Sequence, residues 1–334
     1  MEYTKIGNTD IEISKLCVGC MSFGKAGTMH DWTLDVSATE KVVKHALDLG
    51  INFFDTANGY SQGTSEEYLG KALKNNVQRN KVVIASKVYF NEGRLSKNAI
   101  LREIDGTLKR LGTDYLDLYI IHRFDYETPI EETMQTLDSL VKAGKVRAIG
   151  ASAMYGYQFY NMQMTAKENG WTQFSAMENH YNLLYREDER ELITICRQMN
   201  VTLMPYSPLA AGHLARPKWQ SDSLRGKTDR VSKGKYDRME QYDMKIVDRV
   251  NELSQKYGCK MSQIAIAWQW AKGVASPIIG ATKAEYFDDA AKALEIKLTD
   301  EDIAYLEEPY VPHPIVGAID KNPPQGVMLL DEKK

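Results

Sequence analysis

The sequence predicts an α/β protein built as a closed (β/α)8 TIM barrel, and three observations carry this prediction. Short apolar segments of strand-like composition recur along the chain, and amphipathic helical segments separate most of them. No linker interrupts the eight units, which favours a closed barrel over an open doubly wound sheet. The motif G-x-G-x-x-G, which an open dinucleotide-binding sheet carries after its first strand, is absent. We therefore expect residues 1–334 to form a single barrel domain.

Runs of apolar and β-branched residues locate the strands. Residues 1–14 predict a two-stranded hairpin that turns at Gly7-Asn8 and closes the bottom of the barrel. The eight barrel strands are predicted at residues 16–24, 51–57, 81–88, 115–122, 147–153, 174–181, 201–209 and 276–280.

Three of the intervening helices carry clear start and stop signals. Residues 37–40 (Ser-Ala-Thr-Glu) predict a capping box, and residues 128–131 (Thr-Pro-Ile-Glu) predict another with proline at the first helical position. Ser96 is expected to start the third of these helices. Each of the three ends at a glycine, the preferred stop residue: Gly50, Gly144 and Gly112.

Two segments depart from the strand–helix rhythm. Residues 216–243 are polar and follow strand seven, so we expect a long lid-like loop on the face where a barrel of this kind does its chemistry. Residues 309–334 form a proline-rich C-terminal tail without helical periodicity. The tail is expected to be either disordered or folded over the barrel.

The composition is typical of an ordinary soluble globular protein, with 43% hydrophobic residues, 26% charged residues and a net charge of −3. No cluster of Lys and Arg indicates a nucleic-acid partner. We find no secretion signal and no membrane segment, so a cytoplasmic location is expected. Cys17 and Cys20 are expected to be buried strand residues rather than a metal or redox pair, and no metal site is predicted. A homo-oligomer is left open.

Four polar residues fall at the ends of three consecutive predicted strands. Asp55 ends strand two and Tyr60 follows it, while Lys87 and His122 lie at the ends of strands three and four. A buried lysine needs a counter-ion, which Asp55 can supply. We expect the ammonium to lower the pKa of Tyr60, making the phenol an acid usable near neutral pH. His122 is expected to orient the same substrate oxygen or relay a proton.

Other interpretations of these residues stay open. Each residue alone can be explained structurally, as a turn carboxylate, a surface aromatic, a strand-end lysine or a core histidine. Lys87 could also be a Schiff-base nucleophile of a barrel lyase or aldolase. That hypothesis does not explain the spacing of Asp55 and Tyr60.

The order of several short motifs along the chain resembles that of one protein family. The pattern D-T-A-x-x-Y, a strand-ending lysine and I-H-R-x-D, in a chain that begins with a short hairpin, resembles the aldo-keto reductase superfamily. The resemblance runs from about Ile6 to Pro309. Through I-I-H-R-F-D, G-A-S-A-M, H-Y-N-L-L-Y-R-E and S-P-L-A-A-G, the chain looks most similar to bacterial members related to the potassium-channel β subunits.

The resemblance implies a catalytic tetrad of Asp55, Tyr60, Lys87 and His122, with Tyr60 as the proton donor. The implied reaction is NADPH-dependent reduction of an aldehyde or ketone by hydride transfer. The alternative is a cofactor-binding regulatory or scaffold protein of the channel β-subunit type, in which turnover is slow or incidental.

The resemblance also implies where the nicotinamide would lie. Ser152 and Glu178 would contact its carboxamide, and Tyr206 would stack on its ring. Two departures occur here, since relatives often have Asn in place of Ala153 and usually Gln in place of Glu178. An ionised Glu178 should favour the positively charged oxidised nicotinamide, so Glu178→Gln is expected to weaken NADP⁺ binding more than NADPH binding.

The remaining implied positions concern the rest of the cofactor and the substrate. Lys283 would supply the charge for the 2′-phosphate of NADP, because Tyr286 stands where relatives often have arginine, so NADPH is favoured over NADH. The pyrophosphate positions are Ser207, Leu209, Gly212 and Arg216, and the positions after strand eight are Gly280, Thr282, Lys283, Tyr286 and Asp289. An aromatic substrate mouth for a small-molecule carbonyl compound is expected from Phe23, Tyr89 and Phe124 together with Tyr60 and Tyr206.

Overall fold

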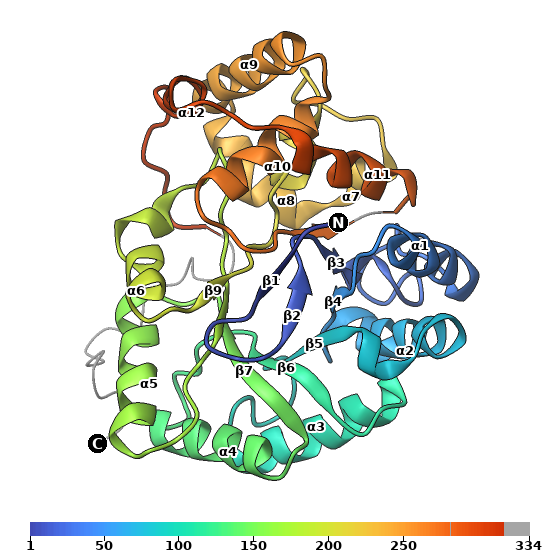
Figure 1. The fold of residues 1–334 in the computed structure, drawn as a ribbon, viewed down its shortest axis with the longest axis vertical. Helices are drawn as coiled ribbons and strands as arrows, with labels where there is room; N and C mark the ends of the chain where they lie inside the picture. The colour runs from blue at the N-terminus through green and yellow to red at the C-terminus, as the bar shows by residue number, and fades with distance from the viewer. Residues whose placement is uncertain (281, 317–334) are drawn as a thin grey trace.

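The computed structural model describes residues 1–280 and 282–316 and confirms the predicted barrel. In this part of the chain, eight parallel strands follow one another around the sheet in the order β10-β3-β4-β5-β6-β7-β8-β9 (Figure 1). The strands are β3 (Cys17–Gly19), β4 (Phe53–Asp55), β5 (Val83–Val88), β6 (Leu116–Ile121), β7 (Val146–Ser152), β8 (Ala176–Glu178), β9 (Thr202–Leu203) and β10 (Ile278–Gly280).

Backbone hydrogen bonds between the regions of β9 and β10 close the barrel. The N–H of Ala275 donates to the carbonyl of Leu203 at 3.0 Å, and the N–H of Ile278 donates to the carbonyl of Pro205 at 3.0 Å. Each predicted strand overlaps an observed one, although all the observed strands except β7 are shorter than predicted. Because all strands run in parallel, their carboxyl ends share one rim of the barrel.

The N-terminal hairpin closes the opposite end, as predicted. Its strands β1 (Tyr3–Lys5) and β2 (Glu12–Ser14) pair antiparallel, and Figure 1 shows them across the middle of the ring of strands. Ile6, Ile11 and Ile13 pack with inward-facing strand residues in a second core cluster. Gly7 has φ +48°, and a Cβ there would lie 2.9 Å from the carbonyl oxygen of Ser175, so the close approach requires glycine.

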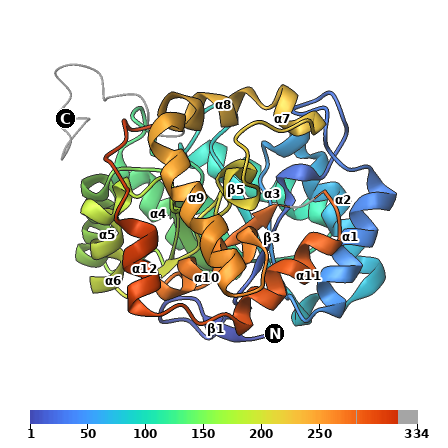
Figure 2. The same ribbon diagram turned by 90° about the horizontal axis from the view of Figure 1, so that it is seen from above.

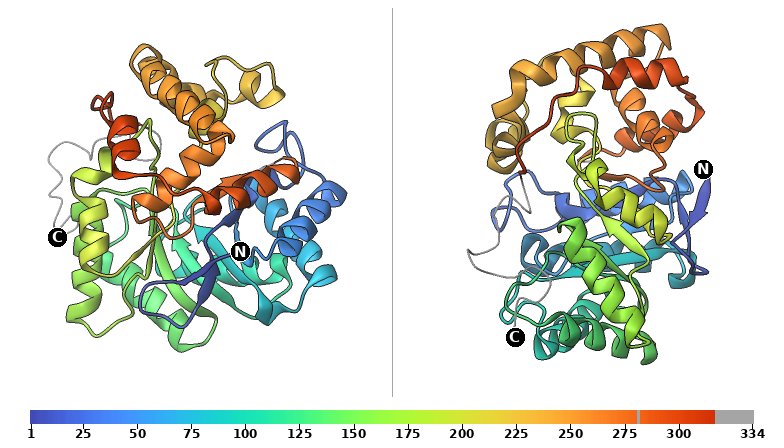
Figure 3. Two further views of the ribbon diagram at one scale, coloured as in Figure 1. Left: turned by 45° about the horizontal axis from the view of Figure 1, so that its top comes forward. Right: turned by 90° about the vertical axis from the view of Figure 1, so that its left-hand side faces the viewer.

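Helices surround the barrel, and the helices nearest the C-terminus, gold to red in Figure 3, gather along one side. None of the helices in residues 1–280 and 282–316 is long and apolar enough to cross a membrane. Besides two short helices after β9, the α-helices are α1 (Val36–Asp48), α2 (Thr64–Asn76), α3 (Lys97–Leu111), α4 (Ile130–Lys142), α5 (Gly156–Glu168), α6 (Leu192–Gln198), α9 (Glu240–Lys256), α10 (Met261–Ala271), α11 (Glu285–Lys292) and α12 (Asp300–Glu307).

Two of the three predicted helix starts have a different cap residue in the structure. Asp35, not Ser37, caps α1, since its carboxylate accepts from the N–H of Ala38 at 2.8 Å. Pro129 occupies the cap position of α4 and Thr128 makes no cap, because its hydroxyl donates to Asp125 at 2.7 Å. A carboxylate is an equally good capping acceptor, and at α1 Asp35 takes that role; at α4 no side chain caps the helix start. The predicted start of α3 after Ser96 is confirmed.

The segment 216–243 is largely helical, which corrects the prediction of a long loop. It contains α7 (Leu224–Thr228), α8 (Arg230–Tyr236) and the start of α9. The side chain of Ser223 caps α7, and that of Asp229 caps α8. Figure 2 shows α7 and α8 on the side of the molecule opposite β1, which is the side of the strand carboxyl ends.

The start of the proline-rich tail packs against the barrel. His313 Nε2 lies 3.0 Å from Asp243 Oδ1, and the hydroxyl of Tyr310 accepts from the N–H of Arg186 at 2.8 Å. The first part of the predicted tail is therefore folded. Its remainder, residues 317–334, lies outside the described residues.

Candidate active site

The four polar groups predicted from the sequence lie at the same rim. Asp55 ends β4, Lys87 is on β5, His122 follows β6, and Tyr60 begins a 3-10 turn, η2 (Tyr60–Gly63), after β4. Parallel pairing aligns Asp55 with Ala85, two residues before Lys87 on the neighbouring strand. Strand register therefore brings residues 32 positions apart in the chain into direct contact.

Lys87 is the centre of the cluster and is fully buried. Its Nζ lies 2.5 Å from Asp55 Oδ2, 3.2 Å from Tyr60 Oη and 3.3 Å from Glu178 Oε2, and it donates to the carbonyl of Thr56 at 3.0 Å. Burial opposes the ammonium, but Asp55 and Glu178 outweigh it and raise the pKa of Lys87 well above its ordinary value. Lys87 therefore remains charged.

Tyr60 differs from the sequence prediction of a lowered pKa. Burial raises the pKa of Tyr60 above its ordinary value, and the opposing effect of Lys87 is too weak to reverse this. The reason is that Lys87 faces two carboxyl groups, Asp55 and Glu178, which offset its charge and disfavour a second anion. Tyr60 consequently keeps its proton and can donate it.

His122 lies beside Tyr60 as a neutral ring. The two ring centroids are 5.7 Å apart in an edge-to-face arrangement. Burial and the nearby charge of Lys87 lower the pKa of His122 well below its ordinary value. His122 Nδ1 is buried without a hydrogen-bond partner in the described part of the chain. A neutral imidazole can orient a substrate oxygen through a hydrogen bond, but it has no surplus proton to relay.

Unpaired polar atoms collect on the neighbouring strands β7 and β8. Ser152 pairs in register with Glu178. Among the described residues, the buried atoms Ser152 Oγ, Glu178 Oε2 and Asn179 Oδ1 have no hydrogen-bond partner, although Glu178 Oε2 faces Lys87 as an ion pair. Such atoms are costly unless a bound group satisfies them. A ligand that carries both donors and acceptors, such as a carboxamide, fits them.

Ala153, which follows Ser152, has an unusual backbone conformation. Ala153 has φ +47°, in the left-handed region that asparagine tolerates better than alanine. Alanine at this position therefore retains backbone strain that asparagine would relieve.

Tyr206 follows β9 and lies within a stack of rings. It is parallel to the ring of His180 at 5.2 Å, and His180 in turn stacks on Tyr185 at 4.2 Å. The ammonium of Lys235, on α8, lies 4.7 Å from the centroid of the Tyr206 ring. Burial, followed by Arg123, lowers the pKa of Lys235 to about 8. Sequence analysis missed Lys235 because a segment predicted as a loop gives no helical register.

The turn after Tyr206 holds Arg216 firmly in place. Arg216 donates to the carbonyl of Gly212 at 2.8 Å and to that of Trp219 at 3.0 Å, while its Nε is buried and unpaired among the described residues. Gly212 has φ +99°, and a Cβ there would lie 2.7 Å from Arg216 Nη1. Ser207 also has a positive φ, of +56°.

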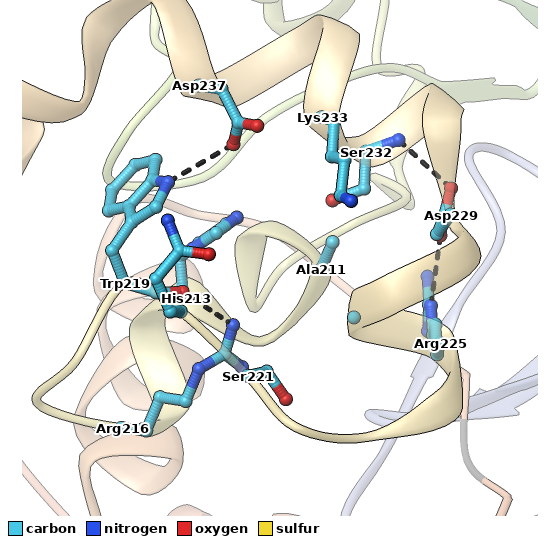
Figure 4. Close-up of a pocket in the computed structure, with 12 residues that line it drawn as sticks. Ala211, His213, Arg216, Trp219, Ser221, Arg225, Asp229, Ser232, Lys233 and Asp237 are labelled. Carbon is cyan, nitrogen blue, oxygen red and sulfur yellow. Dashed lines mark hydrogen bonds and ion pairs between the residues drawn. The ribbon is translucent and has the colours of Figure 1, made fainter.

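A pocket adjoins this turn, and its charged lining is net positive, with Arg216, Arg225 and Lys233 set against Asp229 and Asp237 (Figure 4). Figure 4 shows Arg216 on one side and Arg225 with Asp229 on the other. Arg225 also lies over the ring of Trp32, in the loop after β3, at 4.6 Å. The helices α7 and α8 thus line this pocket together with the turn that contains the predicted pyrophosphate residues Ser207, Leu209, Gly212 and Arg216. A cationic pocket suits a phosphate-bearing ligand.

The predicted adenosine-side residues lie at the end of β10 and on α11. Gly280 ends β10, and Thr282 is half-buried. Lys283 and Tyr286 are exposed near the start of α11. Asp289 is already engaged, because Lys260 Nζ lies 2.8 Å from its carboxylate.

The residues predicted to line the substrate mouth differ in their exposure. Phe23 is fully buried and Phe124 is 5% exposed, and both pack in the hydrophobic core cluster. Tyr89 is half-buried. Phe90, which sequence analysis missed, is 54% exposed, and its ring centroid lies 5.0 Å from that of His122. Its position directly after Tyr89 at a strand end was the available signal.

Comparison with known proteins gives consistent matches over nearly the whole chain. The sequence profile of the Aldo/keto reductase family matches residues 15–310. The versiconal hemiacetal acetate reductase of Aspergillus parasiticus is 42% identical over 340 residues, covering 94% of this chain and 98% of that protein. A Schizosaccharomyces pombe protein, whose name provisionally calls it an aryl-alcohol dehydrogenase, is 42% identical over 350 residues, covering 95% of this chain and 98% of that protein.

A solved structure supports the same assignment. The crystal structure of a thermostable aldo-keto reductase, Tm1743, in complex with the inhibitor epalrestat, superposes with a TM-score of 0.74 at 30% identity. The match covers 92% of this chain and 100% of that one.

Proposed function

Because this chain belongs to the aldo/keto reductase family, we propose that it reduces an aldehyde or ketone to an alcohol with NADPH, and that Tyr60 donates the proton. The protein is an oxidoreductase that acts on carbonyl or alcohol groups. The observation that carries the finer proposal is the buried contact of Lys87 with both Asp55 and the hydroxyl of Tyr60.

Each residue of the proposed tetrad has a distinct task. Tyr60 holds a proton at the rim and gives it to the carbonyl oxygen. Lys87 stabilises the phenolate that results, because its ammonium lies 3.2 Å from the Tyr60 oxygen. Asp55 holds Lys87 charged and oriented. His122, as a neutral ring, positions the substrate oxygen beside Tyr60.

A nicotinamide dinucleotide fits the residues around this cluster. It would supply the hydride. The unpaired atoms of Ser152 and Asn179, with the Glu178 carboxyl beside them, suit the nicotinamide carboxamide, and the Tyr206 ring offers a flat surface for stacking. Arg216 and the cationic pocket beside it suit the pyrophosphate. Together these groups would hold the cofactor at the rim of the barrel.

For the substrate we propose an aryl aldehyde or a comparable aromatic carbonyl compound. The exposed ring of Phe90 beside His122, together with Tyr89, offers aromatic surface next to the proton donor. The name of the Schizosaccharomyces pombe relative points to the same class.

The direct test is to follow the absorbance of the reduced nicotinamide when purified protein meets NADPH with an aryl aldehyde, a quinone or an aliphatic ketone. Oxidation of NADPH with the aryl aldehyde is expected. Tight NADPH binding without turnover on any carbonyl compound would instead favour a regulatory protein. Nothing in the site or among the fungal relatives supports that alternative, and the kinship with channel β subunits stays a prediction.

The Schiff-base hypothesis for Lys87 conflicts with its surroundings. A nucleophilic amine must lose its proton, whereas Asp55 and Glu178 hold the Lys87 ammonium charged. We therefore do not propose lyase or aldolase chemistry.

Lys283→Met is expected to weaken NADPH binding roughly tenfold and to leave NADH binding unchanged, because only NADPH carries the 2′-phosphate for which Lys283 would supply the charge. Fluorescence titration of both cofactors measures this. The matched control is Lys292→Met, which removes an exposed lysine from the other end of α11. Equal weakening of NADPH and NADH by Lys283→Met would contradict the assignment.

Lys235→Met is expected to tighten NADP⁺ binding about twofold to thirtyfold. Lys235 lies over the Tyr206 ring, where the cationic nicotinamide would stack, and a cation–π contact of this kind is worth roughly 0.5–2 kcal/mol. Arg230→Met is the control, since it removes an exposed cation from the same helix at a residue that does not line the pocket. If both variants weaken NADP⁺ binding alike, Lys235 attracts the cofactor phosphates instead of competing with the ring.

A further inference from the structure

The site contains one more buried carboxyl group than its lysine requires. Glu178, at the end of β8, is 3% exposed, and its Oε2 lies 3.3 Å from Lys87 Nζ. Lys87 already has a closer counter-ion in Asp55, at 2.5 Å. One ammonium therefore faces two carboxyl groups in a water-poor environment.

Charge balance requires one of the two carboxyl groups to hold a proton. If Asp55 and Glu178 were both ionised, the cluster would bury an uncompensated negative charge, which is costly. Asp55 has the shorter contact with Lys87, so the proton resides on Glu178. In agreement, burial and the charge of Asp55 raise the pKa of Glu178 to about 8.

The other titratable groups around Glu178 do not change this assignment. Arg123 is the further positive group, and its effect on Glu178 is weaker than that of burial and Asp55. Tyr60 and Cys17 both keep their protons, because burial raises both pKa values. The titratable and charged groups that face Glu178 are Cys17 on β3, Asp55 on β4, Tyr60 after β4, Lys87 on β5, Arg123 after β6 and Tyr206 after β9.

We propose that Glu178 is the proton store of this site: it passes its carboxyl proton through Lys87 to Tyr60 after Tyr60 has protonated the substrate oxygen. This inference rests on the proposed function. The contacts form one continuous path, since Lys87 Nζ lies 3.3 Å from Glu178 and 3.2 Å from the Tyr60 hydroxyl. A glutamine, which relatives usually carry here, cannot hold a transferable proton.

The relay balances in protons and charge. The O–H bond of Tyr60 breaks as the O–H bond of the alcohol forms, the phenolate takes a proton from the Lys87 ammonium, and Lys87 takes the carboxyl proton of Glu178. The electron pair that reduces the carbonyl carbon arrives with the hydride. Tyr60 and Lys87 end as they began, and the negative charge ends on Glu178. Glu178 thus becomes ionised when the neighbouring nicotinamide becomes positively charged.

The first test needs no cofactor. An infrared pH titration of the free protein is expected to show a protonated buried carboxyl that ionises near pH 8, as the raised pKa of Glu178 requires. The band should be lost in Glu178→Gln, whose amide can still accept from Lys87. The control is Asp188→Asn, which removes another buried carboxyl whose pKa burial raises, to about 7. If the band that ionises near pH 8 survives in Glu178→Gln, or disappears only in Asp188→Asn, the inference is overturned.

The second test counts protons released on cofactor binding, by calorimetry in buffers of different ionisation enthalpy. Near pH 7 the wild type is expected to release up to one proton on binding NADP⁺ and far less on binding NADPH, which carries the same phosphates. The difference should fade well above pH 8, where Glu178 is already ionised. Glu178→Gln should abolish the difference at every pH and shift the alkaline limb of the kcat/KM profile. Equal proton release by wild type and variant would refute the proton store.

A failed relay and a failed reductase assignment give different results. Suppose that the carboxyl band is found and is lost in Glu178→Gln, but that no carbonyl compound oxidises NADPH. Glu178 is then confirmed as the protonated carboxyl, and the proposed reaction is refuted. If NADPH is oxidised but the band is missing, the reaction stands and the relay is refuted.

Discussion

Tyr60→Phe is expected to lower kcat with NADPH and an aryl aldehyde by about 10²-fold to 10⁴-fold, the range that a positioned general acid contributes. The substitution removes the hydroxyl that contacts Lys87 and leaves the ring beside His122 in place. NADPH affinity should stay within about twofold, because the proposed cofactor contacts come from other strands. Steady-state rates and fluorescence titration of NADPH separate the two effects.

The matched control for this experiment is Tyr119→Phe. Tyr119 is a fully buried tyrosine on β6, and its hydroxyl has no hydrogen-bond partner among the described residues. Removing it tests whether loss of any buried tyrosine hydroxyl slows the enzyme. If Tyr60→Phe turns over as fast as Tyr119→Phe, Tyr60 is not the proton donor.

Lys87→Met is expected to abolish measurable turnover and to reduce the free energy of unfolding by about 3–5 kcal/mol, the usual cost of leaving a buried charge without its partner. Asp55 and Glu178 would then face each other without a cation. Both folded-state pKa values are already raised by burial, and removing Lys87 raises them further. The folded variant therefore binds more protons than the unfolded chain, so its stability falls as pH rises through those folded pKa values.

Denaturant unfolding at mildly acidic and alkaline pH measures this loss. Lys142→Met is the control, because Lys142 is exposed and pairs with Asp138 on the same helix, a contact worth only a few tenths of a kcal/mol. The double variant Lys87→Met with Glu178→Gln should recover part of the lost stability, since one competing carboxyl is gone. A destabilisation of Lys87→Met that is independent of pH and unrelieved by Glu178→Gln would contradict the charge cluster.

The periodic features of the sequence predicted most of the fold. The hairpin, the eight strands and the start of α3 at Ser96 all follow from local patterns that the chain satisfies without help from distant residues. The cap of α1 was predicted wrongly because Asp35 takes the capping role, and that of α4 because the Thr128 hydroxyl is engaged by Asp125. The segment 216–243 was predicted as a loop because its helices are short, and short helices depend on packing rather than on periodicity.

The sequence by itself determined which groups meet at the rim. Asp55, Lys87 and His122 come at successive strand ends, and parallel strands must place those ends together, so their proximity needs only the fold class. The sequence could not give the exposure of Phe23 and Phe124, because a residue near a strand end can point into the surrounding core as easily as into the mouth.

Only the tertiary structure decided what charge each group carries. Sequence analysis considered Tyr60 beside one lysine and predicted a lowered pKa, whereas the folded site adds burial and a second carboxyl group, which raise it. The placement of Lys235 over Tyr206 and of Glu178 against Lys87 likewise depends on elements far apart in the chain. A pKa is set by the sum of desolvation and all nearby charges, and that sum exists only when the chain is folded.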